Sequence, residues 1–192
     1  MDDVETLSWF QPRPTPSLAL LESLELPERA TVLDVGGGVS NLVDHLQAMG
    51  RYSVTVLDIS QTALAATQGR LGARAASVQW ICGDALEVPL GGPYDLWHDR
   101  AVFHFLTAPE DRARYVERVR RNLRPGGSFI LGTFALDGPS RCSGLPVQRH
   151  DETSLDAALG TAFKRLTTRH DVHLTPSGRE QRFLWSVYLR LP

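Results

Sequence analysis

The sequence predicts one α/β domain in which a mostly parallel sheet ends in an antiparallel hairpin. Its 192 residues suffice for a single sizeable core. Up to residue 134, short apolar segments alternate with segments of helical periodicity, which is typical of a parallel sheet covered by helices. Near the C-terminus, two strand-like segments (164–174 and 179–191) flank the turn TPSG, and such a short turn indicates a hairpin.

Five short segments have the β-branched and apolar composition of buried strands. They are residues 31–35, 53–59, 78–84, 94–99 and 128–134. The last of them follows the turn sequence RPGG. With the hairpin, these segments predict about five parallel strands and two further ones, an ordinary size for a sheet.

Helical segments separate these strands. In the first, Ser40 is placed to cap the start and Gly50 to end the helix. Its apolar side chains share one face: Leu42, Val43, Leu46 and Met49. Ser60 is placed to cap a second helix over residues 61–71.

A third helix is predicted over residues 109–123, with Pro109 in its first turn. Its expected buried stripe is Ala113, Val116, Val119 and Leu123. The arginines between Arg112 and Arg124 alternate with acidic residues, so we interpret them as the solvent face of this helix. A long loop over residues 136–151 then leads to a short helix at residues 152–163.

Composition and charge exclude several classes of protein. The net charge is −2 and no basic block occurs, so we expect no nucleic-acid partner. The apolar runs are too short for a membrane span, and the acidic start MDDVETLSWF is unlike an export signal, so we expect a cytoplasmic protein. Cys82, which we expect in the core, and Cys142 make no disulfide framework, and the histidines have no metal-ligand spacing, so no metal site is expected.

The sequence VLDVGGGVSNL at residues 32–42 places three glycines between a strand and a helix, where an open α/β sheet binds ligands. Glycines there allow the backbone to approach a ligand closely. The dinucleotide pattern G-x-G-x-x-G fails, because Asn41 stands at its sixth position. A phosphate-binding loop is excluded too, because the required Gly-Lys-Ser/Thr is absent.

Three acidic residues end three successive predicted strands. Asp34 precedes the first glycine by two positions and is placed to pair with an ammonium group. Asp58 follows Gly36 by 22 residues, a spacing that suits recognition of ribose hydroxyls. Asp84 is placed for the amino group of an adenine. A ligand with an amine, a ribose and an adenine would satisfy all three acids.

On these residues the chain resembles the class I S-adenosylmethionine-dependent methyltransferases over nearly its whole length. The glycine motif of that family matches Asp34, Gly36 and Gly38, and its ribose-binding acid matches Asp58. The resemblance implies S-adenosylmethionine as the cofactor and a Rossmann-like, doubly wound, seven-stranded sheet whose last strand is antiparallel.

The rest of the family pattern also has counterparts here. The resemblance places Ile59 against the adenine, and Asp84, Ala85 and His98 complete the expected cofactor site. The fourth-strand motif corresponds to YDLWHD, and the turn after the following helix corresponds to LRPGG. Ser40 replaces a third glycine of the motif, which a helix N-cap tolerates.

Three residues after the fourth strand are candidates for chemistry near the methyl group. Asp99 is a candidate catalytic residue, or alternatively caps the helix that begins AVFHFL. Arg100 either faces the site or pairs with Asp95 or Asp99 on the surface. His104 is a possible general base, or alternatively a satisfied core histidine.

Other residues are candidates for covering the site or contacting substrate. Trp9, Phe10 and Gln11 lie in an N-terminal arm (residues 1–17) that either packs on the surface or closes over the cofactor as a lid. Cys142, in the loop after the fifth strand, is either a plain thiol or close to the substrate. His173 either caps the hairpin or contacts the substrate.

We therefore predict a single-domain enzyme that moves a methyl group from S-adenosylmethionine to a heteroatom nucleophile of a small molecule. The Asn/Asp-Pro-Pro-Tyr/Phe motif of nucleobase and amide methylation is missing. The segment HLTPSGREQRF resembles part of some protein-lysine methyltransferases, so a lysine side chain is the alternative acceptor. A non-catalytic cofactor-binding module stays open, whereas Asn41 disfavours a nicotinamide-dependent reductase. We expect a monomer, with a dimer as the alternative.

Overall fold

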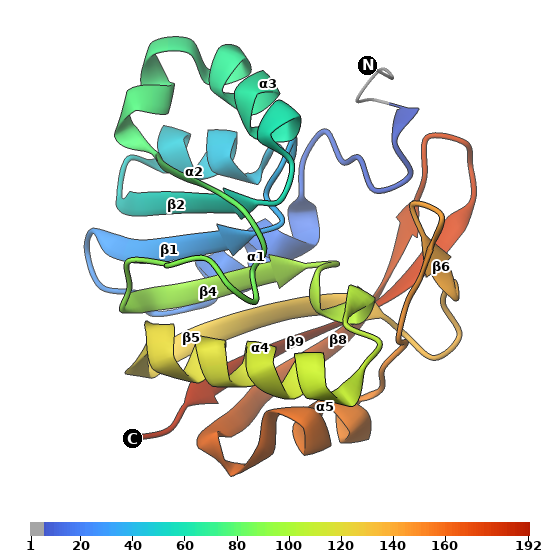
Figure 1. The fold of residues 1–192 in the computed structure, drawn as a ribbon. Helices are drawn as coiled ribbons and strands as arrows, with labels where there is room; N and C mark the ends of the chain where they lie inside the picture. Colours follow the sequence, from blue (N-terminus) through green and yellow to red (C-terminus); the bar gives the residue numbers. More distant parts are fainter. Residues whose placement is uncertain (1–5) are drawn as a thin grey trace.

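The computed structural model describes residues 6–192 as three layers, with a central sheet between two layers of helices (Figure 1). The sheet has seven strands in the order β3-β2-β1-β4-β5-β9-β8. Their bounds are β1 Ala30–Val35, β2 Tyr52–Asp58, β3 Gln79–Cys82, β4 Tyr94–Arg100, β5 Leu123–Phe134, β8 Phe163–Leu174 and β9 Glu180–Arg190. The sequence prediction of a doubly wound seven-stranded sheet is confirmed.

The strand order places the glycine loop at the middle of the sheet. β1 pairs in parallel with β2 on one side and with β4 on the other, so the chain changes direction of winding there. β9 is antiparallel to both β5 and β8, as the C-terminal hairpin predicts. The carboxyl ends of β1 to β5 thus meet at one edge, where α/β sheets bind ligands.

Helices cover both faces of the sheet, and each face has its own apolar core. The helices of the first face are α1 Thr15–Glu22, α2 Leu42–Met49 and α3 Gln61–Leu71. Those of the second face are α4 Pro109–Asn122 and α5 Glu152–Leu159. The short 3-10 turns are η2 Gly72–Ser77, η3 Phe103–Phe105 and η4 Gly160–Ala162.

Several local predictions are confirmed, and others need correction. The side chain of Ser60 caps α3 by accepting from the N–H of Ala63, and Gly50 ends α2 at a φ of 66°. The N-cap of α2 is Asn41 rather than Ser40, although the hydroxyl of Ser40 accepts from the N–H of Leu42 at 3.2 Å. The start of this helix therefore uses both residues.

The buried face of α4 differs from the predicted stripe. Ala113 is exposed, whereas Tyr115 and Val119 are buried. Tyr115 packs edge-on against Trp97 with ring centroids 5.7 Å apart, and the indole N–H donates to its hydroxyl at 3.1 Å. A tyrosine whose hydroxyl finds a partner buries more apolar surface than an alanine, and this decides which face turns inward.

Four features differ from the sequence predictions. Helix α1 begins inside the expected N-terminal arm, and the long loop contains a small hairpin, β6 Arg141–Cys142 with β7 Leu145–Pro146. Strand β5 begins at Leu123, so the RPGG segment is part of an irregular strand. Cys82 is exposed rather than in the core, because β3 is the edge strand of the sheet.

Residues 6–192 contain neither a membrane-spanning helix nor a cluster of metal-binding side chains. No helix there has the length and apolar character needed to cross a bilayer. No cluster of three or more histidine, cysteine or acidic side chains there is arranged to hold a metal ion.

Candidate active site

A cavity of about 510 Å³ lies over the carboxyl edge of the sheet. Its volume is within the range of small-molecule and cofactor sites. One end is formed by the loops after β1, β2 and β3. The other end is formed by the N-terminal arm, the end of β4, the β6–β7 hairpin and the tips of β8 and β9. In Figure 1 the arm runs across this edge between α3 and the β8–β9 tip.

The glycine loop reaches the cavity in a conformation that requires glycine at two positions. Gly36 and Gly38 have positive φ values of 70° and 30°. A Cβ on Gly36 would lie 2.3 Å from Cγ2 of Val102, and one on Gly38 would lie 2.7 Å from Oδ2 of Asp58. A side chain at either position would therefore push the loop away from its neighbours.

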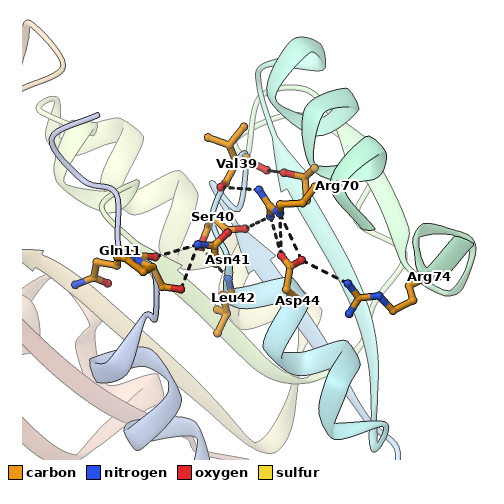
Figure 2. A network of polar contacts seen from close by, with 11 residues as sticks. Gln11, Val39, Ser40, Asn41, Leu42, Asp44, Arg70 and Arg74 are labelled. Atoms are coloured by element: carbon orange, nitrogen blue, oxygen red, sulfur yellow. Dashed lines mark hydrogen bonds and ion pairs between the residues drawn. The ribbon is translucent and has the colours of Figure 1, made fainter. Parts of the chain in front are cut away.

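Helix α3 holds the glycine loop from outside the cavity. The hydroxyl of Thr67 donates to the carbonyl of Gly38 at 2.7 Å. Arg70 donates to the carbonyls of Val39 and Ser40 at 3.2 and 2.7 Å and is held in turn by Asp44, as Figure 2 shows. Three successive carbonyls of the loop are thus held by one helix.

The residues predicted for the ribose and the adenine line one end of the cavity. Asp58 accepts from the N–H of Ser60 at 2.8 Å, and burial raises the pKa of its carboxyl, opposed by this hydrogen bond. Ile59 is 75% exposed although it is apolar, and its side chain lines the cavity. Asp84 and Ala85 line the same end, with Asp84 accepting from the N–H of Leu86 at 2.8 Å.

Asp34 and His98 lie beneath this end and do not line the cavity. Oδ1 of Asp34 contacts Nδ1 of His98 at 2.8 Å, and Nε2 of His98 contacts the hydroxyl of Ser17 at 2.9 Å. All three side chains are buried. The second oxygen of Asp34 has no hydrogen-bond partner among the described residues. This chain of contacts attaches α1 to β1 and β4.

Asp99, a candidate catalytic residue, and His104, a possible general base, are both buried behind the cavity wall. Asp99 accepts from the N–H groups of Val102 and Phe103 and from the hydroxyl of Tyr115 at 2.5 Å. Burial raises its pKa to about 6, although these hydrogen bonds lower it. The geometry favours the capping role, because the carboxylate already accepts three hydrogen bonds.

His104 packs between two aromatic rings. Its ring centroid lies 4.7 Å from that of Phe105 and 4.6 Å from that of Phe134. Burial lowers its pKa to about 3, so the ring is neutral near pH 7. Its Nδ1 accepts from the N–H of Phe134 at 3.4 Å, whereas its Nε2 has no partner among the described residues, so it is a core histidine that is satisfied only in part.

Arg100 and the N-terminal arm meet at the other end of the cavity. Nη1 of Arg100 donates to the carbonyl of Trp9 at 3.2 Å and to Oε1 of Gln11 at 2.7 Å. His173 contacts the carbonyl of Ser8 at 2.9 Å and the side chain of Gln11 at 3.4 Å. Burial lowers the pKa of His173. Trp9 and Gln11 of the arm therefore line this end of the cavity, and residues 1–5 of the arm lie outside the described residues.

Asn41 attaches the arm to the glycine loop. Its side-chain amide donates to the carbonyls of Gln11 and Pro12, both at 3.2 Å (Figure 2). The residue that breaks the dinucleotide pattern thus contacts the arm. The sequence contains no local signal for this role, because the two partners are about 30 residues apart.

The remaining predicted substrate residues differ in position. Cys142 lies on the β6–β7 hairpin, lines the cavity and is buried, and this burial raises the pKa of its thiol. Phe10 is half-buried and does not line the cavity. Of the three aromatic and amide residues predicted in the arm, Trp9 and Gln11 face the cavity.

Comparison with known proteins identifies the family. Residues 32–127, half of the chain, match the model of a methyltransferase domain. The chain therefore belongs to this family, and the class I S-adenosylmethionine-dependent methyltransferase predicted from the sequence is confirmed. A malonyl-[acyl-carrier protein] O-methyltransferase from Anoxybacillus flavithermus is 32% identical over 117 residues, which cover 60% of this chain. The match spans 43% of the length of that relative.

Solved structures share the fold. A methyltransferase from Methanosarcina mazei has a TM-score of 0.76 at 17% identity, with 90% of this chain and 97% of the other covered. A 1,6-didemethyltoxoflavin-N1-methyltransferase from Burkholderia thailandensis, with bound 1,6-didemethyltoxoflavin and S-adenosylhomocysteine, has a TM-score of 0.71 at 22% identity. The coverage there is 93% of this chain and 78% of the other.

The residues present fit S-adenosylmethionine. The glycine loop leaves no room for a Cβ at Gly36 or Gly38, Ile59 exposes an apolar face to the cavity, and Asp58 and Asp84 supply acceptors there. The unpartnered oxygen of Asp34 lies under the loop, 2.7 Å from where a Cβ of Gly37 would be. An adenine and a ribose each have a complementary residue that lines this end, whereas Asp34, predicted for an ammonium group, lies beneath the loop.

Proposed function

We propose that this chain catalyses methyl transfer from S-adenosylmethionine to a heteroatom of a small molecule bound at the arm end of the cavity. The observation that carries the proposal is one continuous cavity that extends from Asp58 and Ile59 to Arg100 and Trp9. The relatives from Anoxybacillus flavithermus and Burkholderia thailandensis support methylation of a heteroatom, since their names describe an O- and an N-methyltransferase. The second of them has a small molecule, 1,6-didemethyltoxoflavin, bound.

The residues at the cofactor end would bind and orient the cofactor. Asp58 would accept hydrogen bonds from the ribose hydroxyls, Ile59 would cover a face of the adenine, and Asp84 would accept from its amino group. When bound, S-adenosylmethionine supplies a methyl group activated by its sulfonium. The protein's task is to hold an acceptor in line with that methyl group, which supplies much of the rate enhancement.

Asp99 acts in this proposal as a positioning residue. Its carboxylate fixes the backbone of Val102, whose side chain packs where a Cβ of Gly36 would lie. It also fixes Tyr115, which lines the cavity. An acceptor that arrives with a free lone pair, such as an ionised oxygen or sulfur, needs no base, and its reaction depends mainly on this positioning.

The arm and the β6–β7 hairpin favour a small acceptor over a protein lysine. Trp9, Gln11, Cys142 and Leu145 line the arm end, so an acceptor has to fit beneath two segments of the chain. Excluding water from this end strengthens electrostatic interactions within it. A lysine on a folded protein would have to enter below the same cover, and no contact of the described residues favours it.

The proposal is tested by following S-adenosylhomocysteine formation with panels of small carboxylic acids, thiols, phenols and amines, and with lysine-bearing proteins. We expect turnover with a small acceptor, and lower turnover in Asp58→Ala at subsaturating cofactor. Turnover only with proteins would favour the lysine alternative. Cofactor binding without turnover on any acceptor would favour the non-catalytic module.

A further inference from the structure

Arg100 is a cation inside the cavity without a carboxylate beside it. Within residues 6–192 no acidic oxygen lies within 4.0 Å of its guanidinium, whereas Arg70, Arg124 and Arg165 each pair with an aspartate. Its hydrogen-bond partners, the carbonyl of Trp9 and the amide of Gln11, are neutral. Burial lowers the pKa of Arg100, opposed by the charge of Asp34, which lies beyond ion-pair distance, and an arginine keeps its charge near pH 7. A partly buried charge of this kind is costly unless an anion joins it.

The contacts of Arg100 leave one edge of its guanidinium open. Both hydrogen bonds are donated by Nη1, and neither Nε nor Nη2 bonds to any described residue. The side chain lines the cavity, and neither atom is among the buried polar atoms that lack a partner within the described residues. Nε and Nη2 form the edge that binds a carboxylate through two parallel hydrogen bonds.

Gln11 holds the guanidinium in this orientation. A carbonyl oxygen only accepts, so the contact with Ser8 places the proton of His173 on Nε2 and leaves Nδ1 as an acceptor. The amide N–H of Gln11 then donates to Nδ1 at 3.4 Å, and its Oε1 is turned to Arg100. The open edge is therefore preorganised before a ligand enters.

We propose that Arg100 is a carboxylate-binding subsite of the cavity and binds its ligand through Nε and Nη2. This rests on the proposed function. Two sources can supply the carboxylate: the acceptor, or the amino-acid end of the cofactor. The walls nearby include Leu145, Phe183 and Trp185, so an acceptor of this kind carries an apolar body beside its carboxylate.

The experiment compares ligands with and without a carboxylate, by calorimetry on Arg100→Met and the wild type. S-Adenosylhomocysteine carries the carboxylate, and 5′-methylthioadenosine lacks the whole amino-acid end. Octanoate, titrated by NMR into protein saturated with S-adenosylhomocysteine, serves as the acceptor probe. Gln11→Ala is the control, because it removes the arm's contact and keeps the guanidinium.

If the cofactor supplies the carboxylate, Arg100→Met lowers the affinity for S-adenosylhomocysteine by roughly ten- to hundred-fold and leaves the affinity for 5′-methylthioadenosine unchanged. If the acceptor supplies it, Arg100→Met abolishes octanoate binding and leaves S-adenosylhomocysteine unchanged. Gln11→Ala has a smaller effect in either case.

The inference is overturned if Arg100→Met changes the affinity for neither S-adenosylhomocysteine nor octanoate. It is also overturned if Arg100→Met weakens the binding of S-adenosylhomocysteine and 5′-methylthioadenosine no more than Gln11→Ala does. Such results leave the proposed function standing when the wild type binds S-adenosylhomocysteine. A wild type that binds no adenosyl ligand overturns both.

Discussion

The hydroxyl of Thr67 donates a hydrogen bond of 2.7 Å to the carbonyl oxygen of Gly38. Thr67 is fully buried, and Arg70, one turn further along α3, holds the next two carbonyls of the loop. The helix after β2 therefore fixes the loop after β1. This contact is long-range in sequence and holds the loop in the conformation that the two glycines permit.

Removing this contact should loosen the loop. Thr67→Val keeps the shape of the side chain but leaves the carbonyl of Gly38 without its buried donor. We expect a loss of about 1–2 kcal/mol in the free energy of unfolding and several-fold weaker cofactor binding. Denaturant unfolding and calorimetry measure the two effects. Thr62→Val, at an exposed position of the same helix, is the control; equal effects in both variants would contradict the role of Thr67.

Asp58 should contribute to cofactor affinity through the ribose. Asp58→Ala removes both oxygens from the cofactor end of the cavity, and we expect weaker binding by about 1–3 kcal/mol, the range for hydrogen bonds to a charged group. Glu28→Ala, which removes an exposed carboxylate outside the cavity, is the control in the same calorimetric titration. Unchanged affinity in Asp58→Ala would place the ribose elsewhere.

His104 should make the fold sensitive to acid. Its pKa is about 3 in the folded chain against 6.5 when unfolded, so the unfolded chain binds more protons between these values. By linkage, the stabilisation is complete above about pH 6.5 and is lost as the pH falls toward 3. His104→Phe removes this titration, so the free energy of unfolding should fall less steeply between pH 6.5 and 4 than in the wild type. Parallel curves for the two proteins would contradict the assignment.

Asp99 should make the fold less stable as the pH rises, the opposite of the effect of His104. Its pKa is about 6 when folded against 3.8 when unfolded, so the folded chain binds more protons in this window. The contribution of Asp99 to the free energy of unfolding is complete below about pH 4 and is lost as the pH rises through 6. Subtracting the curve of Asp99→Asn from that of the wild type should show a decline of on the order of 1–3 kcal/mol across the window. A flat difference would show that Asp99 does not titrate in this way.

The parts of the site that depend on local patterns could be predicted from the sequence. The strands, the glycine loop and the positions of Asp58 and Asp84 follow from hydrophobic periodicity and spacing within one βα unit. The roles of Asn41 and Thr67 could not be predicted, because each depends on a partner about 30 residues away.

The directions of the side chains after β4 also could not be predicted from the sequence. Ala101 adopts a positive φ of 66°, unusual for a residue other than glycine, and the chain turns sharply there. Arg100 lines the cavity and Asp99 lies behind it, although the two are adjacent. The sequence placed Asp99, Arg100 and His104 near the site, but only the turn determines which of them faces the cavity.

The most direct test of the central claim, that the cavity binds S-adenosylmethionine, is a calorimetric titration of the wild type. S-Adenosylmethionine and S-adenosylhomocysteine are the ligands, and NADH is the control. We predict binding of both adenosyl ligands in the micromolar range and none of NADH. Failure of both adenosyl ligands to bind would contradict the assignment of Asp58, Ile59, Asp84 and the glycine loop to the cofactor.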